Sequence, residues 1–214
     1  MKNKVVTRAF NAEMRTSIEK AGVITGRPVI YGSRINLGPF DEIIEYGAIN
    51  ERTDLRDVLF FVNHDLSKIP LARSRRNNGN STMTLTPDEQ GLSMESVLDI
   101  ENNSNARALH SSVGRGDIDG MSFMFSIEKE EWENLESDHP TRRIKEIGRI
   151  IEVSAVNFPA YQETSISARD KTALDNAKEV LDNARRSAGV DTPDAEKRAL
   201  ALELAKARNR NLFV

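Results

Sequence analysis

Three histidines, one serine in an apolar segment and one isolated glutamate are the residues of this 214-residue chain best suited to acid–base or nucleophilic chemistry. His64 directly follows the apolar run VLFFV, and the end of a buried strand can hold a side chain rigidly while presenting it to a cleft. A packed or turn-capping histidine is an equally physical interpretation of that position. His139, in ESDHPT, is typical of a solvated loop, and His110 is expected on the surface of a helix.

Ser122 and Glu152 lie in two further apolar segments. In GMSFMFS, Ser122 alternates with large apolar residues, which turns its hydroxyl away from their packed layer, although most serines on strands have no special role. Glu152 is the only charge in IIEVSAV, and a buried carboxylate needs a partner because desolvation penalises its charge. That partner could be an arginine, such as Arg149 or Arg115, or a histidine that the carboxylate orients.

The composition excludes several kinds of site. The chain has no cysteine, which rules out a thiolate nucleophile and cysteine-ligated metals. It also lacks HExxH, a glycine-rich phosphate loop and a nucleophile elbow, so we expect no metal and no cofactor, and a metallopeptidase is disfavoured. The 30 basic and 33 acidic residues give a net charge of -3, which predicts neither nucleic acid nor a membrane surface as partner. The charged N-terminal segment predicts no secretory signal.

The elements that must position these residues fall into two regions. Up to residue 168, short β-branched and aromatic runs with Gly, Pro and Asn between them predict a strand-rich domain with a few helices. Residues 169–214 form a helical tail with thin apolar stripes, which fits a docking segment as well as a solvated one. The pattern predicts strands at 21–32 (interrupted at Pro28), 57–62, 120–130 and 149–156, a hairpin at 81–98, and helices at 39–48, 103–116, 171–189 and 192–210.

Five blocks together carry a family resemblance. They occur in the order and approximate spacing of the tailed-phage (caudovirus) prohead serine proteases, which mature the capsid: GRPVIYGSRINLGPFDEIIEYGAI, FVNHDLSKIPLARS, TLTPDEQGLSMES, GRGDIDGMSFMFSI and IIEVSAVNFPAYQET. Roughly residues 20–168 resemble this family, and the domain boundary is therefore predicted as 1–168 for the protease and 169–214 for the tail.

The resemblance implies a fold and a set of catalytic residues. The fold would be α+β, with a β-rich bent antiparallel sheet or barrel surrounded by helices, similar to the herpesvirus assemblin proteases. The family's histidine falls on His64 and its nucleophilic serine on Ser122. The acidic position of the EVS strand falls on Glu152, whereas the herpesvirus enzymes use a second histidine there. Arg115 and Gly116, in the loop GRGD, are candidates for binding the oxyanion or the substrate.

The resemblance also implies partners and a place of action. The substrates would be the scaffold protein, the N-terminal extension of the major capsid protein and the protease itself, cut inside the procapsid in the host cytoplasm. The protease would also be able to self-associate. The tail would dock the protease in the procapsid or be removed on maturation. The alternative from another class is a capsid-assembly or scaffold protein that keeps the fold for binding.

Overall fold

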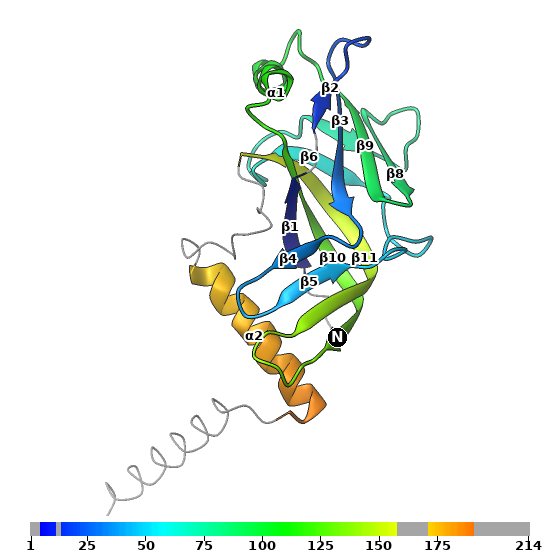
Figure 1. Cartoon of the computed structure of the whole chain (residues 1–214). Helices are drawn as coiled ribbons and strands as arrows, with labels where there is room; N and C mark the ends of the chain where they lie inside the picture. The colour runs from blue at the N-terminus through cyan, green and yellow to red at the C-terminus, as the bar shows by residue number, and fades with distance from the viewer. Residues whose placement is uncertain (1–4, 12–13, 158–170, 191–214) are drawn as a thin grey trace, which may run out of the picture.

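The computed structural model describes residues 5–11, 14–157 and 171–190. Their strands form two sheets (Figure 1). The larger sheet has the strand order β1 (Val5–Asn11), β10 (Gly120–Glu133), β11 (Thr141–Val156), β5 (Asp41–Ile44) and β4 (Arg34–Asn36), with β6 (Val58–Val62) also paired to β11 and β7 (Ala72–Ser74) paired to β6. The smaller sheet has the order β2 (Arg15–Thr16), β3 (Val23–Ile30), β9 (Gly91–Val97) and β8 (Met83–Asp88).

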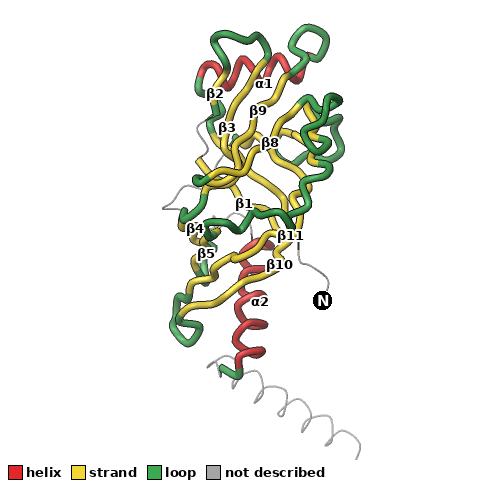
Figure 2. The backbone as a smooth tube through the Cα atoms, turned by 90° about the vertical axis from the view of Figure 1, so that its right-hand side faces the viewer, coloured by secondary structure: helices red, strands yellow, loops and turns green. Residues whose placement is uncertain are grey.

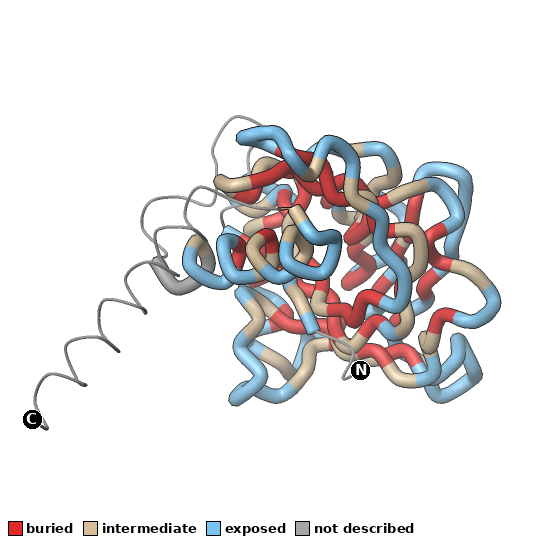
Figure 3. The backbone as a smooth tube through the Cα atoms, turned by 90° about the horizontal axis from the view of Figure 1, so that it is seen from below, coloured by how far each residue is buried: buried red, intermediate tan, exposed pale blue. Residues whose placement is uncertain are grey.

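The long hairpin of β10 and β11 is the centre of the molecule. Its apolar residues point into a core in which Phe123 stacks on Phe125 at 4.3 Å between ring centroids and lies 6.1 Å from Phe10 of β1. Such ring pairs bury large apolar areas and stabilise the sheet interior. Several register shifts along the hairpin bend it. Buried residues lie in the interior of the molecule and exposed ones around its outside (Figure 3).

The expectation of an antiparallel sheet is wrong, because the sheet is mixed. Strand β11 pairs in parallel with β5 along residues 141–144 and with β6 along residues 152–155. A strand of 16 residues is long enough to receive both short partners, one at each end. The barrel is not closed either: within the described residues β1 pairs only with β10 and β4 only with β5.

Within the part of the chain that the structure describes, the sheets are also not surrounded by helices. The described part of the chain contains two, α1 (Ser104–Arg115) and α2 (Lys171–Ala188), which cover separate ends of the strands (Figure 2). Neither is long and apolar enough to span a membrane. The helix predicted at 39–48 is wrong as well, since Asp41–Ile44 forms β5 and all four residues are buried. A helix so short would leave its backbone groups unpaired, whereas β11 supplies partners for them.

Several predicted elements are confirmed. The 81–98 hairpin forms as β8 and β9, and β3 shows a register shift between Gly26 and Val29, around the proline that was expected to interrupt it. Helix α1 begins after Asn103, whose side chain accepts hydrogen bonds from the first turn, and ends at Gly116, which has a left-handed φ of 76°.

Helix α2 lies inside the predicted tail and packs on the strand-rich part of the molecule. Ala177 and Leu181 are buried, and Arg185 donates hydrogen bonds to the carbonyls of Leu135 (3.0 Å) and Ser137 (2.6 Å) in the turn between β10 and β11. The second helix predicted in the tail, at 192–210, lies outside the described residues.

Candidate active site

The chain turns sharply where β6 ends, and this turn carries His64. Asn63 and His64 both adopt left-handed backbone conformations, with φ of 52° and 58°. The turn is held to β11: Asn63 N donates to the carbonyl of Ala155 (2.8 Å), and Asn157 N donates to the side-chain oxygen of Asn63 (3.1 Å). Left-handed backbone is unfavourable for most L-residues, and asparagine tolerates it better than most. These contacts fix the direction in which the His64 side chain leaves the strand.

Three adjacent strands bring His64, Ser122 and Glu152 together. Ser122 on β10 lies opposite Ser154 on β11, and Glu152 is two residues before Ser154. Strand β6 runs parallel to this part of β11, and the turn after it brings His64, two residues past the strand, back beside Ser154. His64 Nε2 lies 2.6 Å from Ser122 Oγ, while His64 Nδ1 contacts Glu152 Oε1. The three residues predicted from sequence therefore form one hydrogen-bonded row.

Glu152 is fully buried, and its two oxygens have different partners. One contacts His64, and the other accepts a hydrogen bond from Ser154 Oγ at 2.6 Å. The alternative of a buried ion pair with an arginine is wrong. Arg149 lies 3.9 Å from Asp54 instead, and Arg115 binds Asp117 and Ser111. The carboxylate is thus arranged to orient an imidazole.

The hydrogen bonds define the proton positions that the row can hold. A carboxylate is an acceptor, so the proton on the His64 ring belongs at Nδ1, and Nε2 is then free to accept from Ser122. Ser122 Oγ also lies 2.8 Å from the carbonyl of Arg8 on β1, which competes for the same hydroxyl proton. Such a serine, beside the acceptor nitrogen of an oriented histidine, can be deprotonated as it attacks an electrophile.

Comparison with known proteins agrees with this chemistry. A family model described as caudovirus prohead serine protease matches residues 10–179. The chain belongs to this family. It is therefore a serine peptidase of phage prohead maturation. The prohead protease of Enterobacteria phage HK97 is 27% identical over 180 residues, which cover 82% of this chain and 73% of the relative. No solved structure matches, so the similarity to the herpesvirus assemblin fold stays a prediction.

The other two histidines of this prohead protease do not belong to the hydrogen-bonded row of His64, Ser122 and Glu152. His139 is exposed in its loop, as expected, and its Nε2 lies 2.9 Å from Asp41. Burial raises the pKa of Asp41, but hydrogen bonds from His139 and Arg34 outweigh it and leave that pKa below its ordinary value. His110 is half-buried on α1, and its Nε2 has no partner among the described residues.

Three further residues bear on the site: Arg115 and Gly116, which the sequence analysis named as binding candidates, and Ser154, which it did not name. Arg115 and Gly116 end α1, and the guanidinium of Arg115 binds Asp117 and Ser111 rather than any member of the row. Ser154 was missed, although it sits two residues after Glu152 and so faces the same side of β11. Besides donating to Glu152, its hydroxyl accepts from the backbone N–H of His64 at 3.2 Å. No cluster of three metal-ligating side chains occurs in the part of the chain that the structure describes.

Proposed function

We propose that this prohead protease cleaves peptide bonds by acyl transfer, with Ser122 as nucleophile. His64 would take the hydroxyl proton through Nε2 as Ser122 attacks the scissile carbonyl, and would then give that proton to the leaving amine. Glu152 would hold the imidazole with its proton on Nδ1 and stabilise the imidazolium that forms. The 2.6 Å separation between Ser122 Oγ and His64 Nε2, with Glu152 on the opposite ring nitrogen, is the observation that carries this proposal.

Ser154 is proposed as a positioning residue. Its hydroxyl joins the backbone of His64 to the carboxylate of Glu152, so it fixes both ends of the His64–Glu152 contact. A hydroxyl that donates to a buried carboxylate also stabilises its charged form, which the imidazolium needs as a partner.

Two conditions must be met before Ser122 can react. Only 1% of the residue is exposed, so the structure around the hydroxyl must open for a peptide carbonyl to approach. The oxyanion also needs donors. Arg115 and Gly116 remain the proposed donors, and Arg115 would have to leave Asp117 to serve.

The proposed substrates are the N-terminal extension of the major capsid protein, the scaffold protein and the protease itself, inside the procapsid. Membership of the prohead protease family supports this proposal. Within the predicted tail, α2 is packed on the body, so we place the proposed docking role in residues 190–214.

The test is Ser122→Ala, co-expressed with the capsid protein and compared with wild type. We expect wild type to shorten the capsid protein and Ser122→Ala to leave it uncut. Ser126→Ala, which removes another buried serine hydroxyl from β10, is the matched control and should cleave normally. Cleavage by Ser122→Ala would exclude this nucleophile. An uncut capsid protein with wild type would favour the capsid-assembly role instead.

A further inference from the structure

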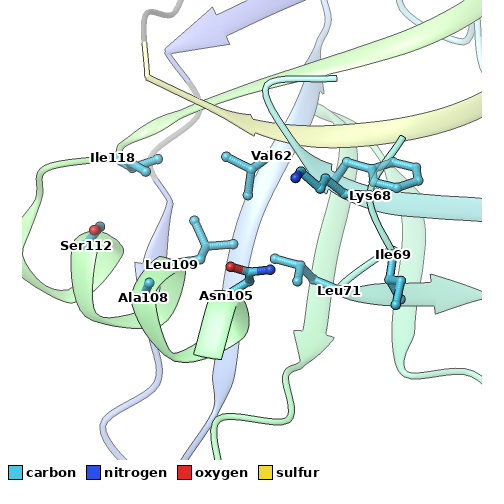
Figure 4. Close-up of a pocket in the computed structure, with 10 residues that line it drawn as sticks. Val62, Lys68, Ile69, Leu71, Asn105, Ala108, Leu109, Ser112 and Ile118 are labelled. Atoms are coloured by element: carbon cyan, nitrogen blue, oxygen red, sulfur yellow. The ribbon is translucent and has the colours of Figure 1, made fainter. Parts of the chain in front are cut away.

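An apolar cavity of about 310 Å³ lies between α1 and the loop that follows β6. Figure 4 shows Leu109 of α1 on one side, facing Val62 at the end of β6, with Leu71 and Ile118 completing the apolar wall. The only charged side chain of the lining is Lys68. The volume corresponds to about ten water molecules at ~30 Å³ each, so this is a space that could hold a ligand group rather than a packing defect.

This cavity lies close to the proposed active site, because some of its lining residues are near His64 and Ser122 in the sequence. Val62 is two residues before His64, so their Cα atoms are at most ~7.6 Å apart, and Ile118 is four residues before Ser122, which limits that separation to about 14 Å. The loop that forms the outer wall starts at His64 itself: Leu66 N donates to the His64 carbonyl at 2.9 Å. A peptide lying across Ser122 could therefore reach the cavity with a side chain one to three residues from the scissile bond, at ~3.3 Å per residue.

The same loop leaves large apolar side chains in water. Leu66 is 54% exposed and Ile69 is 82% exposed. Ile69 belongs to the cavity lining, as do the exposed Lys68, Asn105 and Ala108, and the other lining residues are half-buried or buried. An apolar group entering the cavity would remove this surface from water, which is favourable by roughly 25 cal/mol per Å² of apolar area.

We propose that the cavity is the subsite that binds a large apolar side chain of the peptide substrate, and that Lys68 favours an acidic residue next to it. The proposal rests on the proposed function, because it assumes that peptides are cleaved at Ser122. The charge at the rim supports the second part: Lys68 is exposed, and an exposed ammonium attracts a nearby carboxylate without a large desolvation cost. The cavity would thus select where in the capsid and scaffold chains the enzyme cuts.

The test profiles cleavage of a peptide library made by digesting denatured cell proteins, using the full-length enzyme. With wild type, we expect the cleaved peptides to share a large apolar residue at one fixed position, within three residues of the cut, with acidic residues enriched beside it. Ala108→Phe places a ring in the cavity from an exposed position of α1. It should lower kcat/KM for those peptides by about 10- to 100-fold while peptides with a small residue there change little.

Two further variants complete the design. Ser104→Phe adds the same ring at the first residue of α1, at an exposed position outside the lining, and it should keep the wild-type profile. Lys68→Glu should reverse the preference for acidic neighbours. A wild-type profile without a fixed apolar position, or an unchanged profile with Ala108→Phe, would overturn the subsite while leaving the protease intact. Absence of any Ser122-dependent cleavage would instead refute the proposed function on which it rests.

Discussion

A single buried carboxylate decides how His64 can act. Glu152 is fully buried, and its two oxygens contact His64 and Ser154. A buried carboxylate held in this way favours an imidazole that carries its proton on the nitrogen facing it and becomes a cation when Ser122 loses its proton. At the scale of residues, the arrangement therefore predicts that charge on Glu152 matters more than its shape.

Glu152→Gln tests that statement, because glutamine keeps the shape of the side chain and removes its charge. We expect kcat to fall by about 10³- to 10⁴-fold, since the amide can stabilise the unproductive tautomer of His64 and cannot balance the imidazolium. The measurement is kcat on a peptide identified from the capsid protein. Glu146→Gln, on the same strand but paired with the exposed Arg52, is the control and should change kcat little. A loss below about tenfold would remove Glu152 from the mechanism.

Ser154→Ala tests the positioning role. Removing the hydroxyl leaves one Glu152 oxygen and the His64 backbone N–H without their partner. We expect kcat to fall by about tenfold or more with KM nearly unchanged, the equivalent of a hydrogen bond to a charged group. Ser154→Thr keeps a hydroxyl and should recover most of kcat. If alanine and threonine variants lose only stability, measured by urea unfolding, and retain kcat, Ser154 is structural.

At the scale of elements, the turn after β6 places His64 in the proposed active site. Strand β6 alone would carry His64 onward along its own direction, but the left-handed conformations of Asn63 and His64 redirect the chain. The hydrogen bonds from Asn63 and Asn157 hold that turn on the end of β11, where Glu152 and Ser154 lie.

Asn63→Ala and Asn63→Gly separate two contributions of Asn63 to this turn: its side-chain hydrogen bond and its tolerance of a left-handed backbone. Both variants lose the hydrogen bond to Asn157, but only alanine also has a side chain that disfavours φ of 52°. We expect alanine to lower the free energy of unfolding by about 1 kcal/mol more than glycine does. Urea unfolding measures that difference, and kcat should fall further with alanine than with glycine. Equal effects of the two variants would show that backbone conformation at Asn63 is not limiting.

At the scale of the whole molecule, the segment before β6 is tied to the middle of β11. Asp54 N donates to the carbonyl of Gly148 (2.8 Å), and Ile150 N donates to the carbonyl of Asp54 (3.2 Å). This contact joins the two stretches where β5 and β6 pair with β11. Hydrogen bonds from the side chain and backbone of Arg56 hold the pKa of the Asp54 carboxyl well below its ordinary range.

This lowered pKa predicts how stability depends on pH. A carboxyl whose pKa is lower in the folded state stabilises the fold above its unfolded pKa of about 4, and that contribution is lost as the pH falls further. Asp54→Asn should therefore be less stable than wild type at pH 7, with the difference shrinking below pH 4. Urea unfolding at pH 7, 5 and 3 checks this. Because Glu51→Gln alters an exposed carboxylate of the same loop, it is a suitable control, and a pH-independent difference for Asp54→Asn would contradict the expectation.

The alternation of apolar and polar residues, together with the positions of glycine and asparagine, determined much of the local structure. The 81–98 hairpin, α1 with Asn103 and Gly116 at its ends, and the strands carrying Ser122 and Glu152 follow from side-chain periodicity and from the conformations that glycine and asparagine favour. The roles of His64, Ser122 and Glu152 came from family resemblance, because spacing along the chain says nothing about residues 58 and 88 positions apart.

Only the tertiary structure decided which strands pair and which side chains contact one another. Residues 39–48 have a helical pattern, but β11 offered four of them a strand's hydrogen bonds, and long-range pairing of that kind overrides local propensity. Parallel pairing of β11 with β5 and with β6 made the sheet mixed. The turn after β6 gave Glu152 a histidine rather than an arginine as its partner, with Ser154 hydrogen-bonded to both residues. Sequence fixes which side chains can face one side of a strand, whereas the neighbouring strand and its register are set by the packing of the whole chain.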